Sequence, residues 1–227
     1  MLGPTRWVLF PAPMADHDLP CNDPRAEQSL LVVTKEHGMQ AVSDEQLIQW
    51  VAGGDASCLG TLFERHHRGV YQFCLQMTRN PGHAEDVVQE VFLKILKSSK
   101  GFRNEGTFKG WMYNIARNAT FDYLRQNRRH GDPAEPGEYL DSLQVDELSA
   151  EHSAEGRQRM GNLVEALATL PSHFQEIIWL GRFEFDSFKE LGQALDCKAG
   201  TARVRMHRAM QQLNLAFAEI NGAPFDG

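Results

Sequence analysis

One acidic segment divides this sequence. Residues 132–155 carry eight acidic side chains, no lysine or arginine, and little apolar content. Such a segment buries too little apolar surface to order itself, so it indicates a linker. We therefore expect two folded parts, at residues 43–131 and 157–217, joined by an acidic flexible linker at 132–156.

The basic residues are also grouped. Residues 94–130 carry nine bases against two acids, and residues 198–208 carry four bases and no acid, although the chain as a whole has a net charge of −7. Two basic blocks on either side of an acidic linker indicate that the basic parts bind a polyanion.

Composition excludes several other classes of protein. No apolar run approaches the ~20 residues of a membrane span. The cysteines show no CxxC or CxxH spacing, which argues against a zinc site or a disulfide framework and favours reduced thiols in the cytoplasm. They are Cys21, Cys58, Cys74 and Cys197.

Apolar residues recur at steps of three and four through both parts, and strand-like segments are short and weak, so the fold class is predicted to be all-α. Capping residues mark several starts, among them Ser43, Asn80-Pro81 and Pro171. The predicted helices run from Ser43 to Gly53, Asp55 to Met77, Pro81 to Leu96, Phe108 to Arg129, Arg157 to Leu170, from Pro171, from Ser187 to Leu195, and from Lys198 to about Phe217. Residues 1–42, which are broken by prolines, are predicted to be a disordered extension, and residues 218–227 a C-terminal tail.

The last three predicted helical segments have the spacing of a helix-turn-helix, with a tight turn at Asp196-Cys197 between the final two. On the second of them, one side forms a buried seam of Ala202, Met206, Ala209 and Leu213. The opposite side carries Gly200, Val204, His207 and Gln211, with Arg203 and Arg208 on the flanks. A free face with bases near the helix start suits the major groove of DNA. The alternative is a plain three-helix bundle with a solvated basic face.

The predicted helix at 108–129 combines bases with aromatic rings. One side carries Phe108, Met112, Ile115, Ala119 and Tyr123, and the other carries Asn114, Arg117, Phe121, Arg125 and Arg128. Phe121, with Trp111 and Tyr113 nearby, offers rings on which unpaired bases stack. The alternative is a set of core aromatics beside a solvated charge stripe.

The predicted helix at 81–96 has two faces. Its buried stripe consists of Val87, Val88, Val91, Phe92, Ile95 and Leu96, and a second, mixed face consists of Asp86, Gln89, Glu90 and Leu93. The second face is either simply solvated or a docking surface for a partner's helices.

Three motifs together resemble the sigma factors of bacterial RNA polymerase. The segment 84–94 resembles their region-two core-binding motif, and 108–125 resembles their promoter-melting and minus-ten-reading helix. Leu170-Pro171 with the segments 188–192 and 200–209 is similar to region four. The chain lacks the extra regions of housekeeping sigma factors, so over about Ser43 to Leu215 it resembles the extracytoplasmic-function (ECF) group.

This resemblance implies a role for each set of residues. The clamp helices of the largest polymerase subunit would bind Asp86, Gln89, Glu90 and Leu93. The minus-ten region would be held by Lys109, Trp111, Asn114, Arg117, Asn118, Phe121, Arg125, Arg128 and Arg129, the last two on phosphates of the upstream duplex. The minus thirty-five element would be read by Arg203, Val204, His207 and Arg208, with Lys198, Thr201 and Arg205 on the backbone.

The resemblance also implies partners: core RNA polymerase, promoter DNA as duplex and melted strand, and an anti-sigma factor. The acidic linker would thread polymerase channels, its carboxylates imitating phosphates. No cofactor and no metal are expected.

Two other functions compete with this interpretation. A stand-alone helix-turn-helix regulator would bind duplex DNA tightly without polymerase. An enzyme is disfavoured because the sequence contains no P-loop, nucleophile elbow or HExxH motif. The pair His66-His67 does not make a metal site, since adjacent helical residues point about 100° apart.

Overall fold

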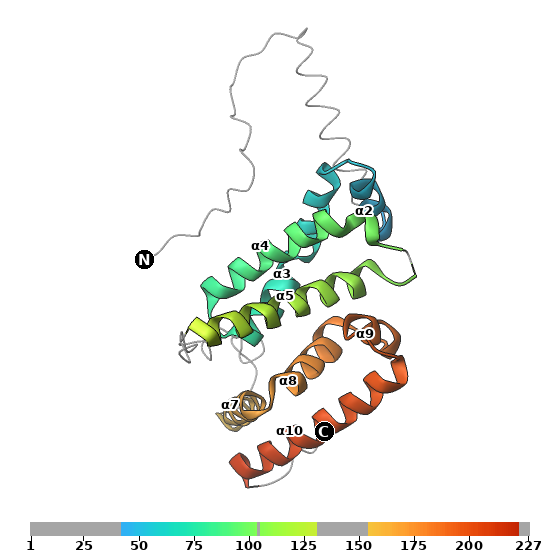
Figure 1. The fold of residues 1–227 in the computed structure, drawn as a ribbon. Coiled ribbons are helices and arrows are strands. Elements are labelled where there is room, and N and C mark those ends of the chain that lie inside the picture. Colours follow the sequence, from blue (N-terminus) through green and yellow to red (C-terminus); the bar gives the residue numbers. More distant parts are fainter. Residues whose placement is uncertain (1–41, 104, 131–153, 223–227) are drawn as a thin grey trace, which may run out of the picture. The chain divides into compact units, whose positions relative to one another are not determined.

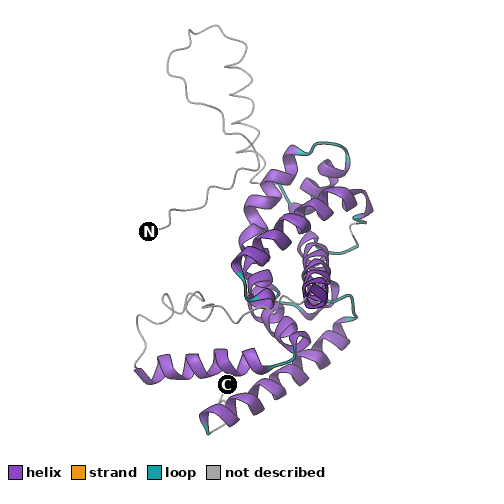
Figure 2. Ribbon diagram, turned by 60° about the vertical axis from the view of Figure 1, so that its left-hand side comes forward, coloured by secondary structure: helices purple, strands orange, loops and turns teal. Residues whose placement is uncertain are grey.

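The computed structural model describes residues 42–103, 105–130 and 154–222, which lie in one compact unit, and regular secondary structure in these ranges is helical throughout (Figure 2). The all-α prediction is therefore confirmed for the described part of the chain. The predicted extension at 1–42, apart from Val42, and most of the predicted linker at 132–156 lie outside the described residues. Within the described ranges, no helix has the length and apolarity that a membrane crossing requires.

The first group of helices is here called the N-terminal module (Figure 1). It consists of α2 (Asp44–Ala52), α3 (Ser57–Thr78), α4 (Pro81–Ser98), a short 3-10 turn η1 (Ser99–Gly101) and α5 (Phe108–His130). α3 packs against α2, α4 and α5, and α4 also packs against α5.

Local capping explains where these helices begin. The Ser43 hydroxyl accepts a hydrogen bond from the backbone N–H of Gln46 at 3.3 Å, and the Asn80 side chain accepts one from the N–H of His83 at 3.1 Å. Both sites were predicted from the sequence. Asp55 accepts a bond from the N–H of Ser57 at 3.2 Å, and α3 begins at Ser57.

The core of the N-terminal module is formed by large apolar side chains of all four helices. Its fully buried members include Leu47, Ile48, Leu62, Phe73, Ile95, Phe108 and Met112. The Phe73 ring meets the edge of the Tyr113 ring with 6.0 Å between centroids. These contacts fix α5 along its length against α3 and α4.

Two side chains do not lie where the sequence pattern predicted. Tyr113, expected near the exposed rings of α5, is 1% exposed, because Phe73 covers one side and Phe185 of a later segment lies 5.5 Å away. Leu96, expected in the buried stripe of α4, is 38% exposed. The burial of Tyr113 fits the alternative of core aromatics, whereas the prediction that Leu96 is buried was wrong.

The second group of helices is here called the C-terminal module. It consists of α7 (Ala154–Thr169), α8 (Ser172–Trp179), a π-helical turn η3 (Leu180–Glu184), α9 (Phe188–Ala194) and α10 (Ala199–Asn221). α10 packs against α7, α8 and α9 through Ala202, Ala209, Leu213 and Phe217. It extends into the predicted tail as far as Asn221.

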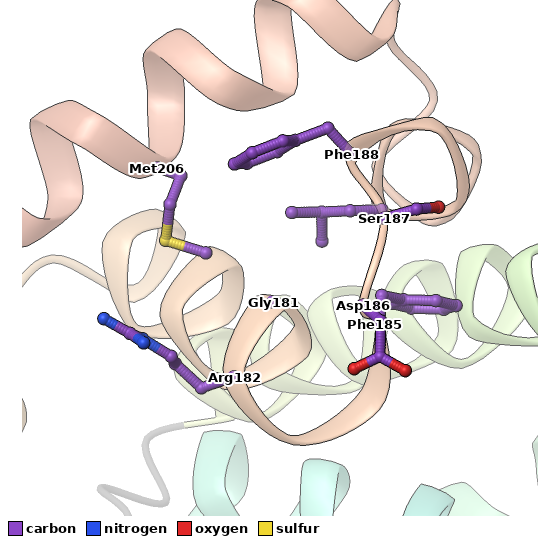
Figure 3. Close-up of a pocket in the computed structure, with 8 residues that line it drawn as sticks. Gly181, Arg182, Phe185, Asp186, Ser187, Phe188 and Met206 are labelled. Carbon is purple, nitrogen blue, oxygen red and sulfur yellow. The ribbon is translucent and has the colours of Figure 1, made fainter.

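A cavity of about 250 Å³ lies among η3, the start of α9 and α10 (Figure 3). Met206 reaches across it toward Gly181, where the bare backbone leaves room for the thioether, and Phe188 lines another side. Met206 was predicted in the buried seam of α10. It is only half-buried, because it borders this cavity.

The turn between α9 and α10 is tight, as predicted. Asp196 has the left-handed φ of 50°, and the N–H of Cys197 donates a 2.8 Å hydrogen bond to the carbonyl of Gly192. A Cβ on Gly192 would lie 2.6 Å from the Cys197 carbonyl oxygen. Gly192 therefore lets the backbone of the turn fold back onto α9.

We expect Gly192→Ala to lower the free energy of unfolding by ~1–3 kcal/mol, because the added methyl group overlaps backbone atoms. The measurement is urea denaturation followed by circular dichroism. Gly161→Ala on the exposed side of α7, where nothing lies within 4 Å, is the control and should raise stability by ~0.5–1 kcal/mol. Equal stability of the two variants would contradict the prediction.

Candidate nucleic-acid interface

The mixed face of α4 lies open to solvent. Asp86 and Gln89 are exposed, Leu93 is 54% exposed, and Glu90 is half-buried with its carboxylate 2.7 Å from Lys94 Nζ. The structure thus brings together all four residues predicted to bind polymerase. An exposed leucine among carboxylates and amides suits docking by another helix.

Leu96 extends this face, and the sequence analysis missed it. It follows Leu93 by three residues and is 38% exposed. A step of three from an exposed leucine places a side chain on the same helix face, which was the available signal.

On α5, the predicted contact residues differ in exposure. Asn118 and Arg125 are exposed, whereas Lys109, Trp111, Asn114, Arg117 and Phe121 are half-buried. The Trp111 ring packs 5.4 Å from the Phe102 ring, and the Arg117 guanidinium lies 5.7 Å from the centre of the Phe121 ring. Phe121 and Arg117 therefore lie side by side on this surface, whereas Trp111 packs against Phe102.

Several of these α5 side chains are bonded to the C-terminal module. Lys109 Nζ lies 3.0 Å from Glu184 Oε2 and donates to the Glu184 carbonyl at 2.6 Å. Asn114 Nδ2 donates to the Ala194 carbonyl at 3.3 Å. Arg117 Nε pairs with the Glu176 carboxylate. The sequence analysis did not predict these partners, because they lie 59 to 80 residues away along the chain.

Glu176 is an unusual partner because it is only 3% exposed. Burial raises the pKa of Glu176 to about 6, and the guanidinium groups of Arg117 and Arg205 offset only part of that effect. At neutral pH the carboxylate therefore stays charged at a cost in desolvation.

The outer side of α10 forms the most open of the predicted surfaces. All seven predicted contact residues are exposed, and they are Lys198, Thr201, Arg203, Val204, Arg205, His207 and Arg208. The Arg203 guanidinium lies 5.2 Å from the centre of the Phe188 ring, which holds it beside the start of the helix. Ala202, Ala209 and Leu213 are buried on the opposite side. The predicted division of this helix into a seam and a free face is confirmed except at Met206, which is half-buried.

Two predicted contact residues of α5 cannot be placed in detail. Arg128 and Arg129 lie in the last turn of α5, and their side chains are outside the described residues.

Among the described residues, no three His, Cys, Asp or Glu side chains gather as metal ligands. His66 Nε2 instead lies 2.6 Å from the Asp44 carboxylate. Burial raises the pKa of Asp44, but the hydrogen bonds and positive charges of His66 and Arg65 outweigh that effect and lower the pKa below its usual value.

Part of the chain matches a known family model, and its fold is similar to that of solved structures. The family model "Sigma-70 region 2" matches residues 62–130. The fold is similar to that of CnrH, solved in complex with the cytosolic domain of CnrY, with a TM-score of 0.56 and 19% identity over 78% of this chain and 97% of CnrH. It is also similar to that of the sigma factor RpoE of Bartonella quintana, solved with the anti-sigma factor NepR, with a TM-score of 0.51 and 20% identity over 72% of this chain and 96% of RpoE.

Characterised relatives are more similar in sequence. The chain is 32% identical over 165 residues to the ECF RNA polymerase sigma factor SigE of Mycolicibacterium smegmatis, covering 71% of this chain and 63% of that longer protein. It is 32% identical over 159 residues to the RNA polymerase sigma factor CarQ of Myxococcus xanthus, covering 70% of this chain and 88% of CarQ. It is 30% identical over 183 residues to the ECF RNA polymerase sigma-E factor of Haemophilus influenzae, covering 77% of this chain and 95% of that relative.

These relatives match the chain across both modules, and the region-two match contains α4 and α5. The chain therefore belongs to the ECF sigma factors, non-enzymatic subunits that direct RNA polymerase in the initiation of transcription.

Proposed function

We propose that this sigma factor divides initiation among three surfaces. The mixed face of α4 binds core RNA polymerase, the basic face of α5 holds the melted minus-ten strand, and the outer side of α10 reads the minus thirty-five element. The observation that carries the proposal is that all seven α10 residues are exposed on a helix whose other side is buried.

The helices α9 and α10 are proposed to act as a DNA-binding helix-turn-helix. Support comes from the tight turn at Asp196 and from four cations without an acidic residue between Lys198 and Arg208. Gly200, with nothing within 4 Å, leaves the first turn of α10 open to a phosphate. Arg203 and Arg208 are placed to read base edges, and Lys198 to contact the backbone.

The α5 surface is proposed to hold unpaired bases of the non-template strand. Phe121 provides a ring beside the Arg117 guanidinium, and Asn118 and Arg125 are exposed along the same helix. Each base stacked on an aromatic ring contributes ~1–3 kcal/mol, and neighbouring cations neutralise phosphates.

Polymerase is proposed to make the two DNA contacts simultaneous. Holding both modules on one scaffold raises the effective concentration of the second contact once the first has formed. The acidic segment 132–156, which lies outside the described residues except at its end, is proposed from its composition to occupy a polymerase channel in place of nucleic acid. Because its targets are polymerase and the chromosome, we place the protein in the cytoplasm.

An anti-sigma factor is proposed as a further partner. CnrH and the Bartonella RpoE were both solved in complex with a second protein, and NepR is described as an anti-sigma factor. The exposed α4 and α10 faces of this chain offer such a partner the same surfaces that polymerase and DNA require.

The whole proposal is tested by run-off transcription on a genomic DNA library with purified core polymerase. We expect discrete transcripts only when both core polymerase and this protein are present. Tight, sequence-specific binding of the protein alone to duplex DNA, without transcripts, would instead support the stand-alone regulator.

The role of α4 is tested by the double variant Gln89→Ala, Leu93→Ala. Both side chains are exposed, so we expect a fold unchanged by circular dichroism and an at least tenfold weaker affinity for core polymerase, a loss of ~1.4 kcal/mol or more. The control is Glu64→Ala, Arg68→Ala, an exposed pair with the same spacing on α3. Equal polymerase binding by both double variants would remove α4 from the interface.

The role of α10 is tested by comparing two kinds of contact within the holoenzyme. Arg203→Ala or Arg208→Ala should cost ~1–3 kcal/mol on the matched promoter and relax the preference at one base position. Lys198→Ala should weaken binding about equally on all sequences, because a phosphate contact carries no base information. The readout is holoenzyme binding to a library of minus thirty-five variants, and an unchanged preference in both arginine variants would refute the assigned reading face.

A further inference from the structure

One of the two arginines proposed to read bases is held by an aromatic ring of another helix. The Arg203 guanidinium of α10 lies 5.2 Å from the centre of the ring of Phe188, the first residue of α9. A cation within about 6 Å of a ring centre is attracted to the face of the ring. Among the described residues, Arg208 has no such ring contact, and neither arginine has an ion pair. The protein itself therefore holds the two arginines to different degrees.

Phe188 is fixed in place where α9 begins. The Ser187 hydroxyl accepts a hydrogen bond from the N–H of Glu190 at 3.2 Å and lies 3.1 Å from the Glu190 carboxylate. These bonds cap the first turn of α9 and fix the backbone of Phe188. From there the ring reaches toward α10 beside Met206 (Figure 3). Because Phe188 is only half-buried, its ring both lines the cavity and meets Arg203.

The spacing on α10 places the ring between the core and the outer side of the helix. Arg203 and Met206 are three residues apart, so their side chains are neighbours on the helix surface. Met206 reaches into the cavity toward Gly181, whereas Arg203 is exposed. A side chain of α9 that faces the cavity therefore also touches a residue on the proposed reading face.

A ring holds a guanidinium without occupying its hydrogen-bond donors. The N–H groups of arginine lie in one plane and form a fork that suits two neighbouring acceptors. The ring attracts the positive charge and accepts none of the strong hydrogen bonds that a carboxylate would, as Glu176 does from Arg117 Nε. Arg203 therefore keeps its donors for a base edge, and the edge that suits them best is O6 and N7 of guanine.

Holding this side chain before DNA arrives also makes its contact more selective. Ordering a long side chain at an interface costs free energy, and a side chain that is already held loses less freedom on binding. An arginine without such a contact swings more easily to a nearby phosphate, which carries no information about the base. Removal of the ring should therefore reduce the preference for one base more than it reduces binding overall.

We infer that Phe188 is a specificity-determining residue of the minus thirty-five contact, with its ring positioning Arg203 for one base. The inference rests on the proposed role of α10 in reading DNA. Phe188 acts through Arg203 and does not itself read a base. The preference at the position that Arg203 reads then depends on a side chain of α9, whereas the preference at the position that Arg208 reads does not.

Three variants separate the ring from the packing around it. Phe188→Leu removes the ring and keeps an apolar side chain at the cavity, and Phe188→Tyr keeps the ring. The control Met206→Leu changes another wall of the same cavity and leaves both Phe188 and Arg203 in place. Each variant is checked for an unchanged fold by circular dichroism. Binding of its holoenzyme to a library of minus thirty-five variants is then measured.

We expect Phe188→Leu to lower the preference at one base position by about two- to fivefold, the factor that a cation–ring contact at an exposed site contributes. The affected position should be the one that Arg203→Ala relaxes, and the position that Arg208→Ala relaxes should keep its preference. Phe188→Tyr and Met206→Leu should retain the preference at both positions.

A double variant tests whether Phe188 acts through Arg203. In the Arg203→Ala background, Phe188→Leu should cause no further loss at that position, because both changes remove the same interaction. Additive losses, weakening spread evenly over all positions, or equal effects of Phe188→Leu and either Phe188→Tyr or Met206→Leu would overturn the inference and leave the proposed function intact. If Arg203→Ala itself relaxed no position, both the inference and the proposed reading role of Arg203 would fail.

A measurement on the free, unsubstituted chain tests the contact itself and does not require Phe188→Leu to fold. Nuclear magnetic resonance resolves the Nε–H signals of arginine, and the loss of a signal in Arg203→Ala or Arg208→Ala assigns it. We expect the Arg203 proton to resonate upfield of the Arg208 proton, because an aromatic ring shields protons above its face. Coincident signals would show that the ring does not hold Arg203 and would overturn the inference.

Discussion

The ion pair between Arg117 and Glu176 joins the two modules at their most buried charged position. Glu176 is 3% exposed, so its carboxylate has lost nearly all of its water and depends on guanidinium groups nearby. A buried charge deprived of its partner destabilises a protein strongly, by ~3–5 kcal/mol. As long as the Glu176 side chain stays buried it therefore needs a cation nearby, and Arg117 of α5 supplies one together with Arg205 of α10.

The same constraint explains why the three proposed binding surfaces differ in exposure. The α4 face and the outer side of α10 are solvated on helices whose buried sides already pack in their own modules. The α5 surface is less solvated, because Glu176, Glu184 and the Ala194 carbonyl bind side chains on it.

Local interactions made much of the fold predictable from the sequence. Ser43, Asn80 and Ser187 cap their helices through bonds to residues three positions ahead, and such bonds depend on nearby sequence alone. The free face of α10 was predictable for a related reason, since helical spacing separates its bases from Ala202, Ala209 and Leu213.

Contacts between segments far apart in the sequence were not predicted. Tyr113 is buried between Phe73 of its own module and Phe185, which lies 5.5 Å away at the end of the π-helical turn. Nothing in the local sequence distinguishes Glu176 and Glu184 from solvated acidic residues, because their partners Arg117 and Lys109 lie far away along the chain. Helical spacing assigns side chains to faces, but it does not say which faces of two modules meet.

The contacts of Glu176 and Glu184 with α5 also bear on the charge pattern of the chain. A surface that holds phosphates attracts any available acidic group, and a net charge of −7 supplies many of them within the same chain. Selectivity for DNA then requires that the internal acids bind less firmly than a strand with stacked bases. Glu176 meets this requirement through its own burial, because the desolvation that raises its pKa subtracts from the strength of its bond to Arg117. A melted strand on the proposed α5 surface would add base stacking beside Phe121 that no carboxylate provides.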